Sequence, residues 1–309
     1  MNHGLTELSL EERYEQYQKE LQELTMMSDA FMRTVLKEKA CTEHILQILM
    51  KKPDLKVIDQ VIQQDYKNLQ GRSSILDCVV RDSDGRLISV EVQQEKEGAS
   101  PKRARYYSGL LDMNTLQRGQ PFEALPVTYV IFITRGDILG NGLPIYHIQR
   151  TIKETGAVFG DETHILYVDS SRQDSTPLGQ LMHDLNCRTA SEIYSPVLSA
   201  RVRELKETEG GIRTMCEVMD RIYNWGEERG IRIGQERGIQ IGQKQGIQIG
   251  QKQGIQIGQK QGIQIGQERI QRETALNLSE MGMPIEQIAI AVNASIQTIK
   301  EWLNPKQTS

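Results

Sequence analysis

The chain has 309 residues, of which 38% are hydrophobic and 25% charged, with a formal net charge of −4. This length predicts two structural units at about 100 to 200 residues per domain, and the composition excludes wholesale disorder. The longest apolar run, residues 127–134, is far shorter than the roughly 20 residues that span a bilayer, so no membrane partner is expected. Four scattered cysteines without a CxxC spacing argue against a disulfide scaffold or a zinc site. The N-terminus lacks the basic and apolar regions of a signal peptide, which predicts a cytoplasmic protein.

The first elements in the chain are predicted to be helical. Residues 5–27 carry Leu, Tyr and Met at near-helical spacing among Glu, Gln and Lys, which is typical of an amphipathic helix. Ser28 and Asp29 have the chemistry of a cap before a second helix over residues 30–39. Further helix is expected over residues 45–50, before Pro53.

The period then changes to that of strands. Residues 75–80 and 86–93 are rich in β-branched residues and flank the turn sequence Asp-Ser-Asp-Gly, which predicts a hairpin. A helix follows, with Ser100 as its cap and Pro101 at its first position. The apolar runs 126–134 and 163–169 have the length of strands covered on both faces, and residues 178–225 are again helical in pattern. Alternating strands and helices predict an α/β core.

An octapeptide repeat occupies residues 226–268. The octet GIRIGQER at position 230 recurs as GIQIGQKQ at 238, 246 and 254 and as GIQIGQER at 262. Each glycine costs a helix about 1 kcal/mol relative to alanine, and marginal helices persist only with a partner. The Gly-rich segment is therefore predicted to be a spacer, either a helix paired with another copy or a disordered tether.

Residues 269–309 are expected to form a small helical tail. Two apolar-periodic stretches are split at residues 293–295, with Ser295 as the cap of the second, an outline similar to a helix-turn-helix. From Glu268 to Leu303 five acidic residues outnumber three basic ones, so groove binding has weak electrostatic support. The charge favours a helical hairpin used for packing or self-association over a DNA-reading module.

The predicted hairpin brings two carboxylates together. A type I turn followed by a left-handed glycine makes residues 82 and 86 face each other. In that register Asp77 lies directly opposite Glu91, with Cβ atoms about 5 Å apart, and Gln93 projects from the same face. Two opposed carboxylates repel each other unless a cation bridges them or one is protonated.

A divalent cation is the expected resolution of this repulsion. Oxygen ligands without histidine or cysteine favour Mg²⁺ or Mn²⁺. Such an ion activates water and offsets charge on a phosphodiester transition state. Asp82 and Asp84 are interpreted as turn formers.

These residues resemble the PD-(D/E)XK nuclease family transposases, also called recombination-promoting nucleases. The likeness runs from roughly Ser28 to Asp169 and extends to the Gly-spaced repeats. It rests on Asp77, on Glu91-x-Gln93 in the next strand, and on the helices to either side of the hairpin. The matching helical residues are Ser28-Asp29-Ala30-Phe31-Met32 upstream and, downstream, Arg103, Arg105, Tyr106, Tyr107 and Leu116-Gln117-Arg118-Gly119.

The resemblance implies a restriction-endonuclease-like mixed sheet flanked by helices, and roles for individual residues. Asp77 and Glu91 would bind the metal, with Asp29 as a further acidic ligand from the first helix. Gln93 would take the position of the motif's lysine, where an amide orients water but adds no positive charge. Two arginines of the following helix are candidate DNA contacts, or else form its hydrated face: Arg103 and Arg105.

We therefore expect an N-terminal helix (1–27), a nuclease domain with C-terminal helices (28–225), a repeat spacer (226–268) and a helical tail (269–309). The expected activity is Mg²⁺- or Mn²⁺-dependent hydrolysis of DNA phosphodiester bonds, linked to recombination, mobile elements or defence. DNA is the expected partner, together with further copies of the chain through the repeats. The alternatives are a catalytically inactive DNA-binding or assembly protein that retains the fold, and a structural oligomer built on the repeats.

Overall fold

The computed structural model describes residues 9–66 and 74–304. It divides the chain into two compact units, Met1–Trp225 and Gly226–Ser309. The helix predicted to begin at residue 5 starts at Leu10 in the described part, and residues 5–8 lie outside that part. Among the helices of the described residues, none has the combined length and apolar character that crossing a membrane requires.

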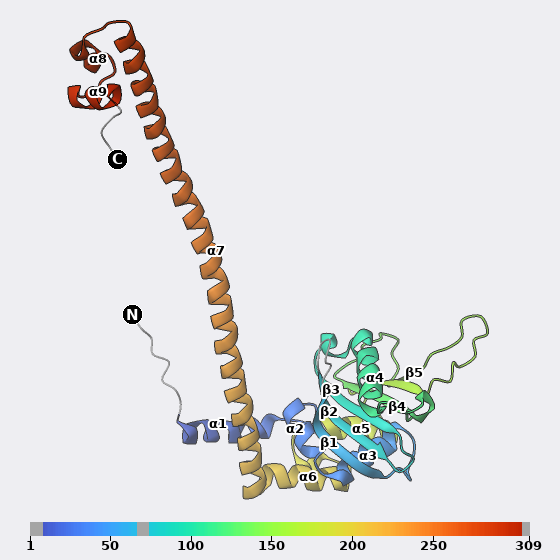
Figure 1. Cartoon of the computed structure of the whole chain (residues 1–309). Coiled ribbons are helices and arrows are strands. Elements are labelled where there is room, and N and C mark those ends of the chain that lie inside the picture. Colours follow the sequence, from blue (N-terminus) through green and yellow to red (C-terminus); the bar gives the residue numbers. More distant parts are fainter. Residues whose placement is uncertain (1–8, 67–73, 305–309) are drawn as a thin grey trace. The chain divides into compact units, whose positions relative to one another are not determined.

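The first unit is built on a sheet with helices beside it (Figure 1). The sheet is mixed and has six strands in the order β1-β2-β3-β4-β6-β5. The strands are β1 (Val57–Tyr66), β2 (Ser74–Asp82), β3 (Leu87–Gln93), β4 (Thr128–Thr134), β5 (Ile145–Ile148) and β6 (Thr163–Asp169). β1, β2 and β3 are antiparallel, β3, β4 and β6 are parallel, and β5 is antiparallel to β6. The carboxyl ends of the three parallel strands therefore meet at one edge of the sheet.

Helices flank this sheet, which confirms the predicted mixed α/β arrangement. They are α1 (Leu10–Glu23), α2 (Asp29–Val35), α3 (Lys39–Leu49), α4 (Pro101–Thr115), α5 (Pro177–Asn186) and α6 (Pro196–Glu207), with short 3₁₀ turns η1 (Lys96–Ala99), η2 (Phe122–Ala124) and η3 (Ala190–Glu192). The predicted start of α4 is confirmed, because the Ser100 side chain accepts a hydrogen bond from the Arg103 backbone N–H and Pro101 occupies the first turn.

Side chains of β4 alternate between two hydrophobic layers. Ile131 and Ile133 pack in a cluster with residues of α2, α3, α5 and α6. Val130 and Phe132 pack in a second cluster with Tyr107, Leu110 and Leu111 of α4. A continuous apolar strand is thus buried on both faces, as expected for a parallel strand in an α/β protein.

Two strands were not predicted from the sequence. β1 is an edge strand in which half-buried and exposed residues alternate, and its many Gln and Asp residues hide the apolar pattern. β5 has only four residues and lies at the opposite edge. Neither has the apolar run that marks β4 and β6.

The long helix α7 (Glu209–Glu280) begins in the first unit and continues through the repeats into the second. The repeats are therefore helical in the structure. The end of α7 packs with α8 (Ile285–Ala291) and α9 (Ile296–Leu303) around Ala275, Ile288 and Ile299. The predicted cap of α9 is present, since the Ser295 side chain accepts from the Thr298 backbone N–H.

Candidate active site

The register predicted for the hairpin is confirmed over four residue pairs, and the pairing of β2 with β3 ends one step before Asp77 and Glu91. Cys78 pairs with Val90 and Arg81 with Leu87, and the Asp82 N–H donates to the Arg86 carbonyl at 3.1 Å. The turn has the expected chemistry, because Gly85 adopts a φ of 79° and the Asp82 carboxylate accepts from the Asp84 and Arg86 backbone N–H groups. Both aspartates of this turn act locally, since Arg86 also forms ion pairs with them.

Glu91 lies at the carboxyl end of β3 and is fully buried. Its Oε1 atom accepts from the Ser89 hydroxyl at 2.9 Å and from the Asp77 backbone N–H at 3.1 Å. Its Oε2 atom is buried and has no hydrogen-bond partner among the described residues. Burial, followed by the neighbouring charge of Asp77, raises the pKa of Glu91 well above its ordinary value.

Asp77 of β2 lies beside Glu91, one residue before the part of the strand that pairs with β3. Its carboxylate accepts a hydrogen bond from the Val92 backbone N–H. Burial and then the charge of Asp29 raise the pKa of Asp77 to about 6, although Arg33 and Arg103 oppose this shift. Ionising Asp77 and Glu91 together is therefore unfavourable without a compensating cation.

Asp29 approaches from the first turn of α2. It forms an ion pair with Arg33, and its side chain is about half exposed at 54%. The surrounding protein partly removes this carboxylate from water, which raises the pKa of Asp29, while Arg33 and Arg103 lower it. Asp29 is thus electrostatically linked to Asp77, but in the described part of the chain these acids and Glu91 do not bring three ligand atoms within 4.8 Å of one another.

Arg103 and Arg105 occupy different environments on α4. The Arg103 Nε atom donates to the Tyr107 hydroxyl at 2.7 Å, and the guanidinium lies 5.0 Å from the centroid of that ring. Its positive charge lowers the pKa of Asp77 and of Glu91. Arg103 therefore faces the acidic cluster, whereas Arg105 is exposed to solvent.

Gln93 is half buried and pairs with Thr134 of β4. Its amide oxygen lies directly against the α-carbon of Gly98 in η1, so that a Cβ added there would overlap with it. The turn after β3 thus fixes where this amide can lie.

Several residues of the site were not singled out from the sequence. Ser89 is two residues before Glu91, so the alternation of a strand could have placed it on the same face. Arg33 follows Asp29 by four positions and Tyr107 follows Arg103 by four, the spacing of helical neighbours. The sequence contains no such signal for Gly98, because its role depends on a tertiary contact with the Gln93 side chain.

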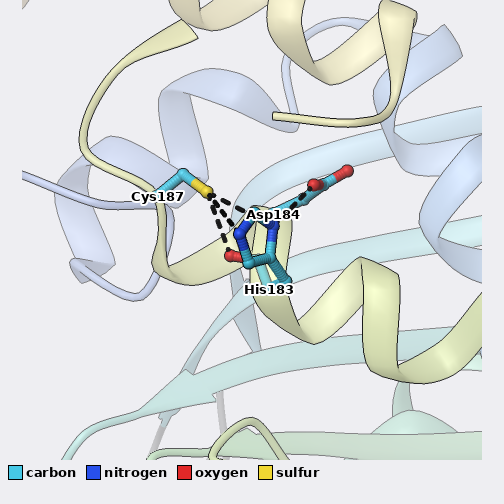
Figure 2. A group of neighbouring side chains, drawn as sticks. All are labelled: His183, Asp184 and Cys187. Atoms are coloured by element: carbon cyan, nitrogen blue, oxygen red, sulfur yellow. Dashed lines mark hydrogen bonds and ion pairs between the residues drawn. The ribbon is translucent and has the colours of Figure 1, made fainter. Parts of the chain in front are cut away.

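A second group of side chains lies on α5 and at its end (Figure 2). The Cys187 sulfur is 3.5 Å from His183 Nδ1 and 3.8 Å from Nε2, so it sits over the ring face, whereas the nitrogen lone pairs lie in the ring plane. The thiol donates to the His183 carbonyl, and burial raises the pKa of Cys187 to about 11. Asp184 accepts from the Tyr194 and Ser195 backbone N–H groups. These contacts define a structural cluster, and we assign no metal to it.

A mixed sheet with an acidic residue on one hairpin strand and Glu-x-Gln on the next is similar to the PD-(D/E)XK class of nuclease folds. The comparison with family models agrees, since residues 31–176 match the family described as PD-(D/E)XK nuclease family transposase. The resemblance seen in the sequence is therefore confirmed over this segment, which contains Asp77, Glu91, Gln93 and both arginines but starts after Asp29. No curated protein and no solved structure matches the chain.

Proposed function

We propose that this chain is a metal-dependent DNA endonuclease that hydrolyses phosphodiester bonds, acting in the cytoplasm in recombination, mobile-element behaviour or defence. The observation that carries the proposal is the buried Glu91 Oε2 atom without a partner, next to the carboxylate of Asp77. A buried carboxyl oxygen without a hydrogen-bond partner is costly in the folded chain, and a bound cation would satisfy it. The family match over residues 31–176 supports a nuclease-like chemistry for the same edge.

The donor set fits Mg²⁺ or Mn²⁺, because it consists of carboxylate oxygens without a sulfur or nitrogen ligand. Asp77 and Glu91 would hold the ion, and Asp29 would join them once released from Arg33. When bound, such an ion supplies Lewis-acid charge that offsets negative charge at the scissile phosphate.

The protein's own groups have separate tasks in this proposal. The Ser89 hydroxyl orients the Glu91 carboxylate. The Gln93 amide, held against Gly98, orients the attacking water without adding charge. Arg103 supplies the positive charge that an amide lacks, and its bond to the Tyr107 hydroxyl aims it at the acids.

Cleavage of supercoiled plasmid by the full chain tests this function. We expect nicked and linear products with Mg²⁺ or Mn²⁺ and none with EDTA. Asp77→Asn and Glu91→Gln should each lower the rate by about 100-fold or more, as expected when a metal ligand is lost. Asp59→Asn is the matched control, because it removes an exposed carboxylate of the neighbouring strand β1.

A second measurement separates metal binding from catalysis. Calorimetric titration of Mn²⁺ should show binding to the wild type and to Asp59→Asn, and none to Asp77→Asn. Plasmid cleavage that persists in EDTA, or in a folded Glu91→Gln variant, would contradict the proposal and favour the catalytically inactive alternative.

We also propose that the repeats join copies of the chain. The ten isoleucines of the octets are each 36% to 67% exposed in the single chain. They are Ile231, Ile233, Ile239, Ile241, Ile247, Ile249, Ile255, Ile257, Ile263 and Ile265. So much exposed aliphatic surface on one helix favours association, and glycine at every fourth residue leaves room for a second helix to approach.

A further inference from the structure

A polar cavity of about 210 Å³ lies beside the candidate active site. Its lining includes Ser28, which precedes Asp29 in the chain, and Gln94, which follows Gln93. The Arg135 backbone N–H donates to the Gln93 carbonyl at 3.3 Å, so the cavity lies at the carboxyl edge of the parallel strands. Open α/β sheets bind ligands at this edge.

Two arginines give the cavity its positive charge. Arg135 is exposed directly after β4, and within the described residues its guanidinium forms no ion pair. Arg188 pairs with Glu23 at 2.8 Å, with both side chains well exposed at 64% and 68%. Exposed ion pairs contribute only about 0 to 1 kcal/mol, so Arg188 can exchange its partner for another anion at little cost.

We propose that Arg135 and Arg188 bind a backbone phosphate of the DNA strand that enters the candidate active site, an inference that rests on the proposed nuclease function. Guanidinium groups match the geometry of phosphate oxygens. Contacts to phosphate set the register of a strand without reading its sequence. In this proposal a strand whose scissile phosphodiester lies at Asp77 and Glu91 extends past the cavity, because the Arg135 backbone N–H is bonded to the Gln93 carbonyl at the same edge of the sheet.

The salt dependence of DNA binding tests the proposal. Fluorescence anisotropy of a labelled duplex with the full chain is measured in EDTA over a series of salt concentrations, so that no cleavage occurs. Arg135→Gln and Arg188→Gln should each raise the Kd about fivefold and lower the slope of log K against log salt by about 1. Arg135→Lys should keep the slope, because it keeps the charge.

The matched control is Arg203→Gln, which removes an exposed arginine paired with Glu207 on α6 and changes the net charge equally. Glu23→Gln should act in the opposite direction. Because it frees Arg188 from its carboxylate, it should lower the Kd for the duplex about twofold or more. Thermal unfolding of each variant checks that the fold is retained.

The outcomes separate this inference from the proposed function. If Arg135→Gln lowers the slope of log K against log salt but the wild type does not cleave DNA in Mg²⁺, the phosphate site is supported and the proposed nuclease activity is contradicted. If the wild type cleaves DNA but Arg135→Gln and Arg188→Gln have the same salt slope as Arg203→Gln, the phosphate site alone is overturned. The absence of duplex binding by the wild type would overturn it as well. Calorimetric binding of inorganic phosphate that Arg135→Gln abolishes, with duplex binding unchanged, would assign the cavity to free phosphate and overturn the DNA proposal.

Discussion

Glu91 shows how one residue sets the energetics of the site. One of its carboxylate oxygens accepts two hydrogen bonds and the other is buried without any. Leaving a buried polar group unsatisfied costs about 1 to 3 kcal/mol, and more when the group is charged. When no cation is present, burial favours the protonated form of both acids and raises the pKa of Glu91 and of Asp77, and the neighbouring charges of Asp77 and Asp29 respectively add to the effect.

With divalent cations chelated, Asp77 should make the fold less stable as pH rises from 3.8 through about 6. The pKa of Asp77 is raised from 3.8 to about 6, so the folded chain holds a proton in this window that the unfolded chain has released. The stabilisation by that proton is fully present below the pKa that Asp77 has in the unfolded chain. It is lost as the pH rises through the pKa that Asp77 has in the folded chain. The loss is on the order of 2 to 3 kcal/mol.

Thermal unfolding in EDTA at several pH values measures this effect. Asp77→Asn should be more stable than the wild type at pH 7 and not at pH 3.5, whereas Asp59→Asn should show no such crossover. A constant difference between Asp77→Asn and the wild type at every pH would contradict the assignment.

Gly98 is expected to act on the reaction through Gln93. A methyl group at Gly98 would overlap with the Gln93 amide oxygen and displace it. Gln93→Leu and Gly98→Ala should each lower the cleavage rate about tenfold, the value of one hydrogen bond, and Gln93→Lys should retain or raise the rate. In a double-mutant cycle, Gly98→Ala should have little further effect once Gln93 is leucine. Additive losses would show that the glycine acts independently of the amide.

At the scale of elements, the repeat helix has an unusual surface pattern. Glycine at every fourth residue advances by about 40° beyond a full turn, so the glycine stripe winds around α7. A period longer than 3.6 residues winds in the right-handed sense. The isoleucines of each octet are rotated about the helix axis by about 80° relative to those of the preceding octet. The isoleucines are therefore distributed around the whole helix. A second copy can therefore follow the glycines only by winding along them.

Replacing three of these glycines tests that packing. Gly242, Gly250 and Gly258 have no neighbouring atom within 4 Å of an added Cβ in the single chain. Alanine at all three should raise the helical circular dichroism signal, at about 1 kcal/mol per site, while lowering the self-association measured by sedimentation. The control replaces Gln243, Gln251 and Gln259 with alanine. Stronger association of the glycine variant would exclude close packing at these positions.

The hairpin could be predicted because its information is local. The turn residues from Asp82 to Arg86 set the loop length, and that loop sets the register that brings Asp77 next to Glu91, whose carboxylate accepts from the Asp77 N–H. β4 and β6 could also be predicted from the sequence, because strands buried on both faces have continuous apolar sequences.

The rest of the site depends on contacts between distant segments. Asp29 was expected near Asp77 only through the family resemblance. The sequence contains no sign that Arg103 turns toward the acids while Arg105 does not, or that η1 abuts Gln93. The edge strand β1 was missed for a related reason. Its polar residues are satisfied at the sheet edge by solvent, so its sequence lacks the pattern of a buried strand.

At the scale of the molecule, residues 1–225 should fold without the second unit. The first unit has its own hydrophobic clusters on both faces of the sheet. Light scattering should give a monomer for residues 1–225 and a larger particle for the full chain. The shorter chain should also bind long DNA more weakly, because linked sites raise the effective concentration. Equal monomer masses would rule out assembly through the repeats and favour a tether.

The octets of α7 also have a genetic consequence. Near-identical peptide copies are typical of a tandem duplication of the coding DNA, in which slippage during replication adds or removes whole copies without a frameshift. Each octet gained adds about 12 Å of helix within the second unit and turns the residues that follow it by about 80°. Strains that differ in octet number would thus carry the same first unit with helices graded in length and phase, a heritable variation confined to one segment of the protein.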